Sequence, residues 1–311
     1  MNSSLRKVAL VGGSGHLGPS ILQALQSDPT TFDVTVISRH SSQALFPPST
    51  KVLRVSDDYP PDEMVSAFRG HDAVVLSLNF AAEFQHHSAL VDASIEAGVK
   101  RLIPSVWAGR IDVAEAREIF PLAAVKYGVL EYVRRRAVEC EGWSWTSVST
   151  GLFSDLCLET NFYGLDPSTH TAKIWGDGTA KFSATTHDSI GLAVAAILKS
   201  HPAETKNKDV YISSFDISLN DLLAAYKSAT GVSDWTINTG DVDEGIEEAK
   251  RVHATSSDVM EKMRAMGLLG LLVGLKEGLG ADFTAAGVVD NEMLGVPRGD
   301  LEQAVVRALK K

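Results

Sequence analysis

Lys7-Val-Ala-Leu-Val-Gly-Gly-Ser-Gly-His-Leu-Gly18 is the stretch that decides the fold. A short apolar run leads directly into a glycine-rich turn, and residues 16–27 then follow a helical pattern. The turn contains Gly-x-Gly-x-x-Gly at Gly13, Gly15 and Gly18. Because glycine has no Cβ atom, such a turn can be tight, and its backbone N–H groups can approach a pyrophosphate at the start of the helix. The order of strand, glycine turn and helix therefore predicts a dinucleotide-binding unit.

Short apolar runs continue to alternate with helical segments along the first half of the chain. Strands are expected at residues 33–38, 51–55, 73–77, 101–105 and 144–148, and helices at 62–68, 85–97 and 122–141. Strands that are apolar on both faces are typical of a parallel sheet covered by helices on both sides. We therefore predict an α/β fold, with a doubly wound Rossmann domain over residues 1–152.

The composition changes after residue 152, where loops rich in Gly, Asp, Ser and Thr separate mixed strands and several helices. We interpret residues 153–311 as a smaller α/β lobe that binds the substrate, and the helix at 187–200 as a segment that could pack on the first domain instead. The apolar stretch at 266–275 is shorter than the roughly 20 residues of a membrane span, so we expect a buried or pocket-lining helix there.

Acidic residues outnumber basic ones by 39 to 29, which gives a formal net charge of −10. This balance argues against nucleic acid or an anionic membrane as the partner, because both attract clustered Lys and Arg. Two cysteines do not form a disulfide framework or a zinc motif, and residues 1–7 lack the apolar run of a secretory signal. We expect a cytoplasmic protein that binds a small molecule, with no preference between monomer and oligomer.

The end of the second predicted strand indicates which dinucleotide binds. An NAD site usually has an acidic residue there, about 20 residues after the glycines, to bind the ribose 2′-hydroxyl. This chain has Ser38-Arg39-His40 instead. A guanidinium can bind a 2′-phosphate through two hydrogen bonds, and no acidic residue at this position would repel the phosphate. The sequence therefore favours NADP(H), selected by Arg39.

Two familiar kinds of catalytic site are missing from the pattern. The Tyr-x-x-x-Lys motif of ordinary short-chain dehydrogenases is absent, since Tyr127 is followed four residues later by Glu131 and Tyr132 by Arg136. The neighbouring His86 and His87 diverge by about 100° on a helix and cannot readily bind one ion together. We predict no metal site.

Several segments together resemble the NmrA-like or isoflavone reductase-like family of atypical short-chain dehydrogenases, and the fungal members most closely. They are Val11-Gly-Gly-Ser-Gly-His-Leu-Gly18, Val36-Ile-Ser-Arg39, Ala97-Gly-Val-Lys-Arg-Leu-Ile-Pro-Ser105, Lys126 ahead of Glu131-Tyr-Val-Arg-Arg135, and Trp145-Thr-Ser-Val-Ser-Thr-Gly-Leu-Phe153. The likeness covers residues 6–230. Family members include NADPH-dependent reductases of plant phenylpropanoids and regulators that sense NADP without catalysing a reaction. The resemblance thus implies the cofactor more firmly than the reaction.

The resemblance also implies roles for individual residues. In the family's reductases a lysine after strand five contacts the nicotinamide ribose and assists proton transfer; Lys126 matches it, whereas a gapless fit to the plant enzymes would place Glu131 there. A lysine in an apolar pocket can have its pKa lowered toward neutrality and serve as an acid or a base. The expected cofactor-binding residues are Gly12, Gly13, Ser14, Gly15, His16, Leu17, Gly18, Arg39, Ser77, Leu78, Asn79, Ser105, Lys126, Gly151 and Phe153. The expected substrate pocket consists of His87, Trp107, Phe153, Phe162 and Tyr163.

These inferences favour an NADPH-dependent reductase of a small aromatic or polyketide-like secondary metabolite, in which the nicotinamide gives the hydride and Lys126 assists protonation. Two alternatives stay open. One is a non-catalytic NADP(H)-sensing regulator of the NmrA type, which would bind a protein partner. The other is a redox-neutral isomerase on the same fold.

Overall fold

The computed structural model describes residues 5–28 and 30–310, and its largest sheet is parallel, with five strands in the order β3-β2-β1-β4-β5. These strands are β1 (Lys7–Val11), β2 (Asp33–Arg39), β3 (Lys51–Val55), β4 (Ala73–Leu76) and β5 (Arg101–Ile103). β6 (Thr146–Ser149) lies beside β5 through a bridge between Leu102 and Trp145, and pairs with β11 (Lys208–Tyr211). The strand order reverses between β1 and β4, which confirms the predicted doubly wound α/β fold.

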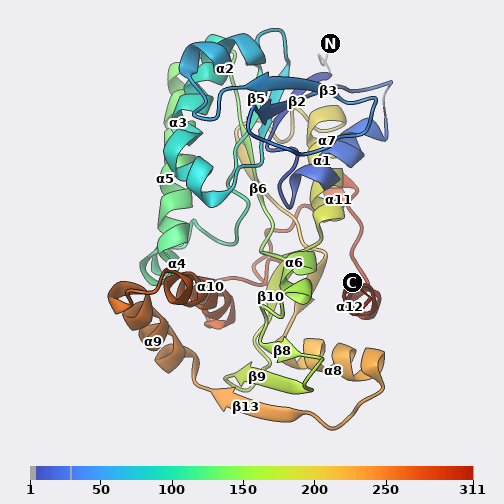
Figure 1. The fold of residues 1–311 in the computed structure, drawn as a ribbon, viewed down its shortest axis with the longest axis vertical. Coiled ribbons are helices and arrows are strands. Elements are labelled where there is room, and N and C mark those ends of the chain that lie inside the picture. Colours follow the sequence, from blue (N-terminus) through green and yellow to red (C-terminus); the bar gives the residue numbers. More distant parts are fainter. Residues whose placement is uncertain (1–4, 29, 311) are drawn as a thin grey trace.

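Helices cover both faces of this sheet (Figure 1). Because side chains alternate along a strand, Val8 and Leu10 of β1 pack toward one face and Ala9 and Val11 toward the other. The first face is covered by α1 (Gly18–Gln26) and α7 (His187–Lys199), and the second by α2 (Pro61–Phe68), α3 (Phe80–Glu96) and α5 (Pro121–Glu139). α7 packs so closely on α1 that a Cβ atom on Gly191 would lie 2.5 Å from the carbonyl oxygen of Ser20.

Much of the second half of the chain, apart from segments such as α7 and β11 that pack with the first sheet, builds another lobe with its own core, at the bottom of Figure 1. Its two small sheets have the strand orders β12-β10-β7 and β13-β9-β8. The strands are β7 (Leu152–Phe153), β8 (Leu165–Asp166), β9 (Thr171–Trp175), β10 (Phe182–Thr185), β12 (Phe215–Ile217) and β13 (Thr236–Gly240). The remaining helices are α4 (Ala114–Ile119), α6 (Ser154–Glu159), α8 (Leu219–Thr230), α9 (Val242–Thr255), α10 (Val259–Leu275), α11 (Asn291–Leu294) and α12 (Leu301–Ala308). No helix in the described ranges meets the length and apolarity of a membrane span.

The start of α3 differs from the sequence-based expectation. It lies five residues earlier than predicted, because the side chain of Asn79 accepts a hydrogen bond from the backbone N–H of Ala82 at 2.9 Å and caps the helix. α7 begins at His187, as expected, and is capped by Thr186, whose hydroxyl accepts from the N–H of Ser189 at 3.2 Å. The earlier start of α3 places Glu83 in its first turn.

Candidate functional site

The glycine turn is held against the end of β4 by backbone packing that leaves no room for a side chain at Gly12 or Gly18. Gly12 has a φ of +82°, and a Cβ atom on it would lie 2.0 Å from the carbonyl oxygen of Ser77. A Cβ on Gly18 would lie 2.3 Å from the carbonyl oxygen of Gly12. A Cβ on Gly15 would lie 3.5 Å from the carbonyl oxygen of Gly12, which is an ordinary van der Waals contact. The packing of the turn therefore requires glycine at positions 12 and 18 but not at position 15.

A cavity of about 310 Å³ lies over this turn. It joins the glycine turn, the end of β2 and the end of β4, at the carboxyl edge of the sheet where doubly wound proteins bind nucleotides. Its lining residues are Gly12, Gly13, Ser14, Gly15, His16, Ile37, Ser38, Arg39, Ser42, Tyr59, Ser77, Leu78, Asn79 and Ala82. A cradle of glycines at a helix N-terminus with an arginine at its far end fits the pyrophosphate and the 2′-phosphate of NADP(H).

Arg54 holds the loop that carries Arg39. Its Nη1 atom donates hydrogen bonds to the Ser38 hydroxyl at 3.1 Å and to the carbonyl oxygens of Arg39 at 3.0 Å and Ser42 at 2.8 Å. Arg54 is therefore a structural residue here, while the half-buried side chain of Arg39 lines the cavity.

Two residues near Arg39 were not predicted, Asp57 and Tyr59, and of these Tyr59 lines the first cavity. Asp57 follows β3, which pairs with β2, so its carboxylate comes close to Arg39 although the two are far apart in sequence. Hydrogen bonds from Ser41, and the charges of Arg39 and His40, hold the pKa of Asp57 below its usual range. Tyr59 lines the same cavity with a φ of +50° and offers an aromatic ring. Only the strand pairing brings these residues to the site.

A second, mostly apolar cavity of about 370 Å³ lies between the two lobes. Its aromatic lining includes Trp107, Phe153 and Phe162, as predicted, together with Phe120 and Phe182, which the sequence did not single out. The other lining residues are Ala108, Gly109, Arg110, Ile111, Ala116, Leu122, Ala123, Lys126, Gly151, Leu152, Leu156, Cys157, Thr160, Ser183, Gly270, Val273, Gly274, Leu279 and Ala281. Gly270, Val273 and Gly274 come from the apolar helix α10.

Lys126 joins the two cavities through Ser105. The Ser105 hydroxyl accepts a hydrogen bond from the N–H of Leu78, in the wall of the first cavity, at 3.1 Å. The Ser105 carbonyl accepts one from Nζ of Lys126, in the wall of the second cavity, at 3.3 Å. Nζ also lies 3.1 Å from each carboxylate oxygen of Glu83. The sequence analysis missed Glu83 because it placed the start of the helix after this residue.

Several predicted site residues lie outside the two cavities. Tyr163 is 1% exposed and packs on Phe182 in the core of the second lobe, because adjacent residues point in different directions and Phe162 is the one that faces the cavity. His87 is 2% exposed and lines neither cavity. Burial, and then the charge of Lys126, lower the pKa of His87 to about 3, so its ring is neutral. Neither Tyr163 nor His87, both expected in the substrate pocket, lines either of the two cavities.

The predicted cofactor residues fall into three groups. Most line the first cavity, while Lys126, Gly151 and Phe153 line the second. Leu17, Gly18 and Ser105 line neither: Leu17 is buried in the core beneath the turn, Gly18 packs on Gly12, and Ser105 lies behind the wall. No cluster of His, Cys, Asp and Glu that could hold a metal ion occurs within residues 5–28 and 30–310.

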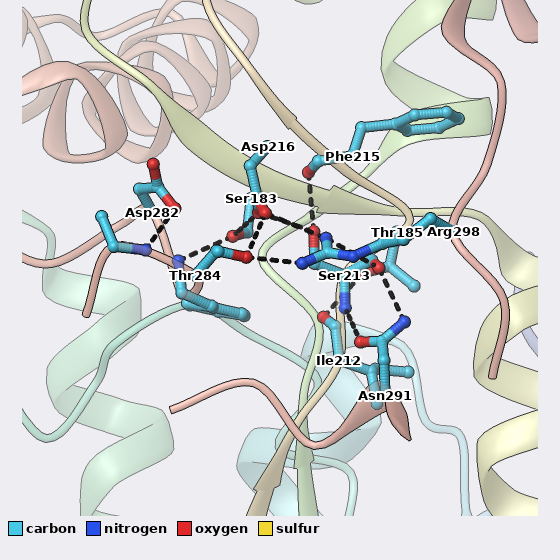
Figure 2. Close-up of polar contacts among 12 residues, drawn as sticks. Ser183, Thr185, Ile212, Ser213, Phe215, Asp216, Asp282, Thr284, Asn291 and Arg298 are labelled. Carbon is cyan, nitrogen blue, oxygen red and sulfur yellow. Dashed lines mark hydrogen bonds and ion pairs between the residues drawn. The ribbon is translucent and has the colours of Figure 1, made fainter. Parts of the chain in front are cut away.

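One wall of the second cavity is fixed by a polar network centred on Asp216 (Figure 2). The segment with Leu279 and Ala281 lies against β10, since the Ser183 N–H donates to the Ala281 carbonyl at 2.8 Å and the Phe283 N–H to the Ser183 hydroxyl at 2.9 Å. Asp216 accepts hydrogen bonds from the hydroxyls of Ser183, Ser213 and Thr284, and forms an ion pair with Arg298 at 2.9 Å.

This network predicts a pH-dependent contribution to stability. Burial raises the pKa of Asp216, but the hydrogen bonds and the charge of Arg298 outweigh burial and leave it below the ordinary value of 3.8. A depressed pKa means that the stabilisation is present above the unfolded-state pKa and is lost as the pH falls through the folded-state pKa. Asp216→Asn should lower the free energy of unfolding by about 1–3 kcal/mol at pH 7, and the difference from wild type should shrink below pH 4.

Urea unfolding at a series of pH values measures this difference. Glu292→Gln, which removes an exposed carboxylate on α11, is the control and should change little. A gap between Asp216→Asn and wild type that widens on acidification, or no gap at pH 7, would contradict this role of Asp216.

Together, a nucleotide cavity over a glycine turn and a separate apolar cavity, linked through Ser105 to the buried Lys126, are typical of a dinucleotide-binding protein. The NmrA-like family model matches residues 4–238. The oxidoreductase aprR of Aspergillus flavus is 34% identical over 307 residues, which cover 98% of this chain and 99% of the relative. The isoflavone reductase homolog IRL of Zea mays is 30% identical over 246 residues, covering 74% of this chain and 76% of the relative.

Solved structures share the fold. The crystal structure of an isoflavone reductase superposes with a TM-score of 0.75 at 19% identity, covering 97% of this chain and 99% of the other. A ternary complex of leucoanthocyanidin reductase from Vitis vinifera gives 0.74 at 17% identity, covering 98% and 100%. The chain belongs to the NmrA-like family, as an oxidoreductase of the isoflavone reductase-like type, which confirms the predicted resemblance.

Proposed function

We propose that this protein is an NADPH-dependent reductase of a small, uncharged aromatic or polyketide-like metabolite. The observation that carries the proposal is that Lys126, in the wall of the second cavity, and Leu78, in the wall of the first, both hydrogen-bond to Ser105, which lies between the two cavities and marks their junction. A cofactor that lies along the first cavity from Arg39 past the glycine turn would bring its nicotinamide toward this junction. A substrate in the second cavity would approach the same point from the other lobe.

The binding of NADP(H) is supported by the first cavity and by structural neighbours. In the proposed complex, the N–H groups at Gly13–Gly15 bind the pyrophosphate and Arg39 binds the 2′-phosphate. A quinone oxidoreductase from Escherichia coli with NADPH and AtPrR2 with NADP+ and pinoresinol share the fold, with TM-scores of 0.72 and 0.72. When bound, NADPH supplies a hydride.

The substrate class follows from the lining of the second cavity. Aromatic and aliphatic side chains make up most of its wall, which favours a ligand that is largely apolar and carries a ring. Of the two cationic residues in the wall, Arg110 donates both Nε and Nη2 to Asp112 at 2.8 Å, and Lys126 contacts Glu83. Since each positive charge has a carboxylate beside it, the cavity does not favour an anionic substrate.

Lys126 would complete the reaction. Its ammonium group lies in the cavity wall and can donate a proton to a substrate oxygen as the adjacent carbon accepts the hydride. Such a reduction balances, because the substrate gains one hydride and one proton while NADPH becomes NADP+.

The test is NADPH oxidation by the purified protein with a panel of quinones, enones, aryl ketones and benzylic ethers, followed by product identification. We expect reduction of at least one apolar ring compound, with one NADPH consumed per product. Tight NADP(H) binding with no oxidation across the panel, and capture of a protein partner that depends on the NADP+/NADPH ratio, would favour the sensor alternative. Conversion of a substrate without NADPH consumption would favour the isomerase.

A further inference from the structure

The ammonium group of Lys126 is surrounded by acceptors even without a ligand. It is positioned 3.1 Å from both Oε1 and Oε2 of Glu83 and 3.3 Å from the carbonyl oxygen of Ser105. Two of these contacts are with the same carboxylate, so Glu83 and Ser105 can be satisfied by two of the three N–H donors of the ammonium, which leaves the third for a substrate. Glu83 thus does more than lie nearby: its carboxylate fixes the direction of the lysine side chain.

Both partners are buried, which makes their pairing consequential. Glu83 is 3% exposed and Lys126 is 9% exposed. Burying a charged side chain costs free energy unless an opposite charge lies beside it. Removing either Glu83 or Lys126 would therefore leave the other as an unpaired buried charge. Burial raises the pKa of Glu83 above its usual range, although the charge of Lys126 and the hydrogen bonds from Lys126 and Ser105 lower the pKa in part.

α3 presents Glu83 to Lys126 by its own geometry. Asn79 caps the helix and places Glu83 in the first turn, where the positive end of the helix dipole favours a carboxylate. His87 lies one turn further along the same face and also feels the charge of Lys126. Because the buried ring of His87 is neutral, it adds no positive charge beside Lys126. Glu83 is then the charged side chain of α3 that contacts Lys126.

We propose that Glu83 is the positioning residue of Lys126: its buried carboxylate keeps the lysine as an ammonium ion and directs it to the junction of the two cavities. This inference rests on the proposed function, in which Lys126 donates a proton. During reduction of a carbonyl, the hydride forms a C–H bond, the C=O π electrons move to oxygen, and an N–H bond of Lys126 breaks to protonate that oxygen. The neutral amine left beside Glu83 then recovers a proton from solvent.

The test measures the charge state of Lys126 directly, without NADPH or substrate. Acetic anhydride acylates amines but not ammonium ions, and the rate at Lys126 is read by mass spectrometry of the peptide that contains it. In Glu83→Gln the side chain keeps its shape but loses its charge, so burial favours the neutral amine of Lys126. We expect acylation of Lys126 at neutral pH to rise about tenfold or more. The exposed Lys206 serves as the internal standard.

The control is Glu96→Gln, which removes an exposed carboxylate from the other end of α3 and should leave the acylation of Lys126 unchanged. Glu83→Asp retains the charge and should stay closer to wild type than Glu83→Gln does. An unchanged or slower rate at Lys126 in folded Glu83→Gln would overturn the proposal.

If Glu83→Gln does not fold, the wild-type protein decides. We expect Lys126 to be acylated far more slowly than Lys206 at neutral pH; a rate at Lys126 equal to that at Lys206, or faster, would overturn the proposal. A protein that passes this test but oxidises no NADPH would refute the reductase function and not the role of Glu83.

Discussion

Lys126→Ala is expected to lower kcat for NADPH oxidation by about 10²- to 10⁴-fold, the range that a positioned general acid contributes. Among the described residues, Lys126 supplies the only ammonium group at the junction of the two cavities, and the substitution removes it. It also leaves the buried carboxylate of Glu83 without its partner, so the fold must be checked by circular dichroism and thermal unfolding. The rate is measured at saturating NADPH with the best substrate of the panel.

Glu131→Ala is the matched control for this experiment. Glu131 is the residue that a gapless fit to the plant enzymes places at the catalytic position, yet in the structure it is half-exposed and pairs with Arg134 at 2.7 Å on the surface of α5. We expect Glu131→Ala to retain nearly full activity. Unchanged turnover in folded Lys126→Ala, or a larger loss in Glu131→Ala, would refute the catalytic role of Lys126.

Gly12→Ala is expected to abolish detectable NADPH binding and to destabilise the protein. Its methyl group would lie 2.0 Å from the carbonyl oxygen of Ser77, and its φ of +82° is unfavourable for any residue with a Cβ atom. Either the turn or the end of β4 must move, which disrupts the cradle for the pyrophosphate. Binding is measured by isothermal titration calorimetry and stability by thermal unfolding.

Gly15→Ala separates the effect on NADPH binding from the effect on stability. Its methyl group would have no neighbour closer than 3.5 Å, so the free protein should keep its melting temperature to within a few degrees. Because Gly15 lines the cavity where the pyrophosphate is proposed to lie, the added methyl group should hinder the close approach of the phosphates to the backbone, and NADPH affinity should still fall strongly. If Gly15→Ala binds NADPH as well as wild type does, the cofactor does not lie over this turn.

The nucleotide-binding half of the protein could be predicted because its signals are local. The run from Lys7 to Gly18 contains a strand, a turn and a helix start in sequence, and close backbone contacts explain the glycines at positions 12 and 18. Arg39 could be placed for the same reason, since it lies at the end of a strand whose pattern is clear. In these regions neighbours in sequence are neighbours in space.

The residues that were missed reach the site through pairings that leave no local pattern. Asp57 comes beside Arg39 because β3 pairs with β2, and Glu83 meets Lys126 because α3 packs near α5. One available signal went unused: Asn79 is a good helix N-cap, and taking it as one would have put Glu83 and His87 on a single helix face. Tyr163 and Phe162 were both predicted to line the pocket, but only Phe162 lines the cavity. Sequence alone does not tell which of two adjacent aromatic residues faces a cavity.

The central claim is that this chain binds NADP(H) through Arg39, and titration of NADPH and NADH into wild type and Arg39→Ala tests it most directly. The guanidinium should contribute about 1.5–3 kcal/mol through charge-assisted hydrogen bonds to the 2′-phosphate, which is roughly a tenfold to hundredfold change in affinity. We predict that wild type binds NADPH more tightly than NADH by about this factor, and that Arg39→Ala loses the preference while NADH binding changes little. Equal affinity of wild type for the two nucleotides, or an equal loss for both in Arg39→Ala, would contradict the assignment.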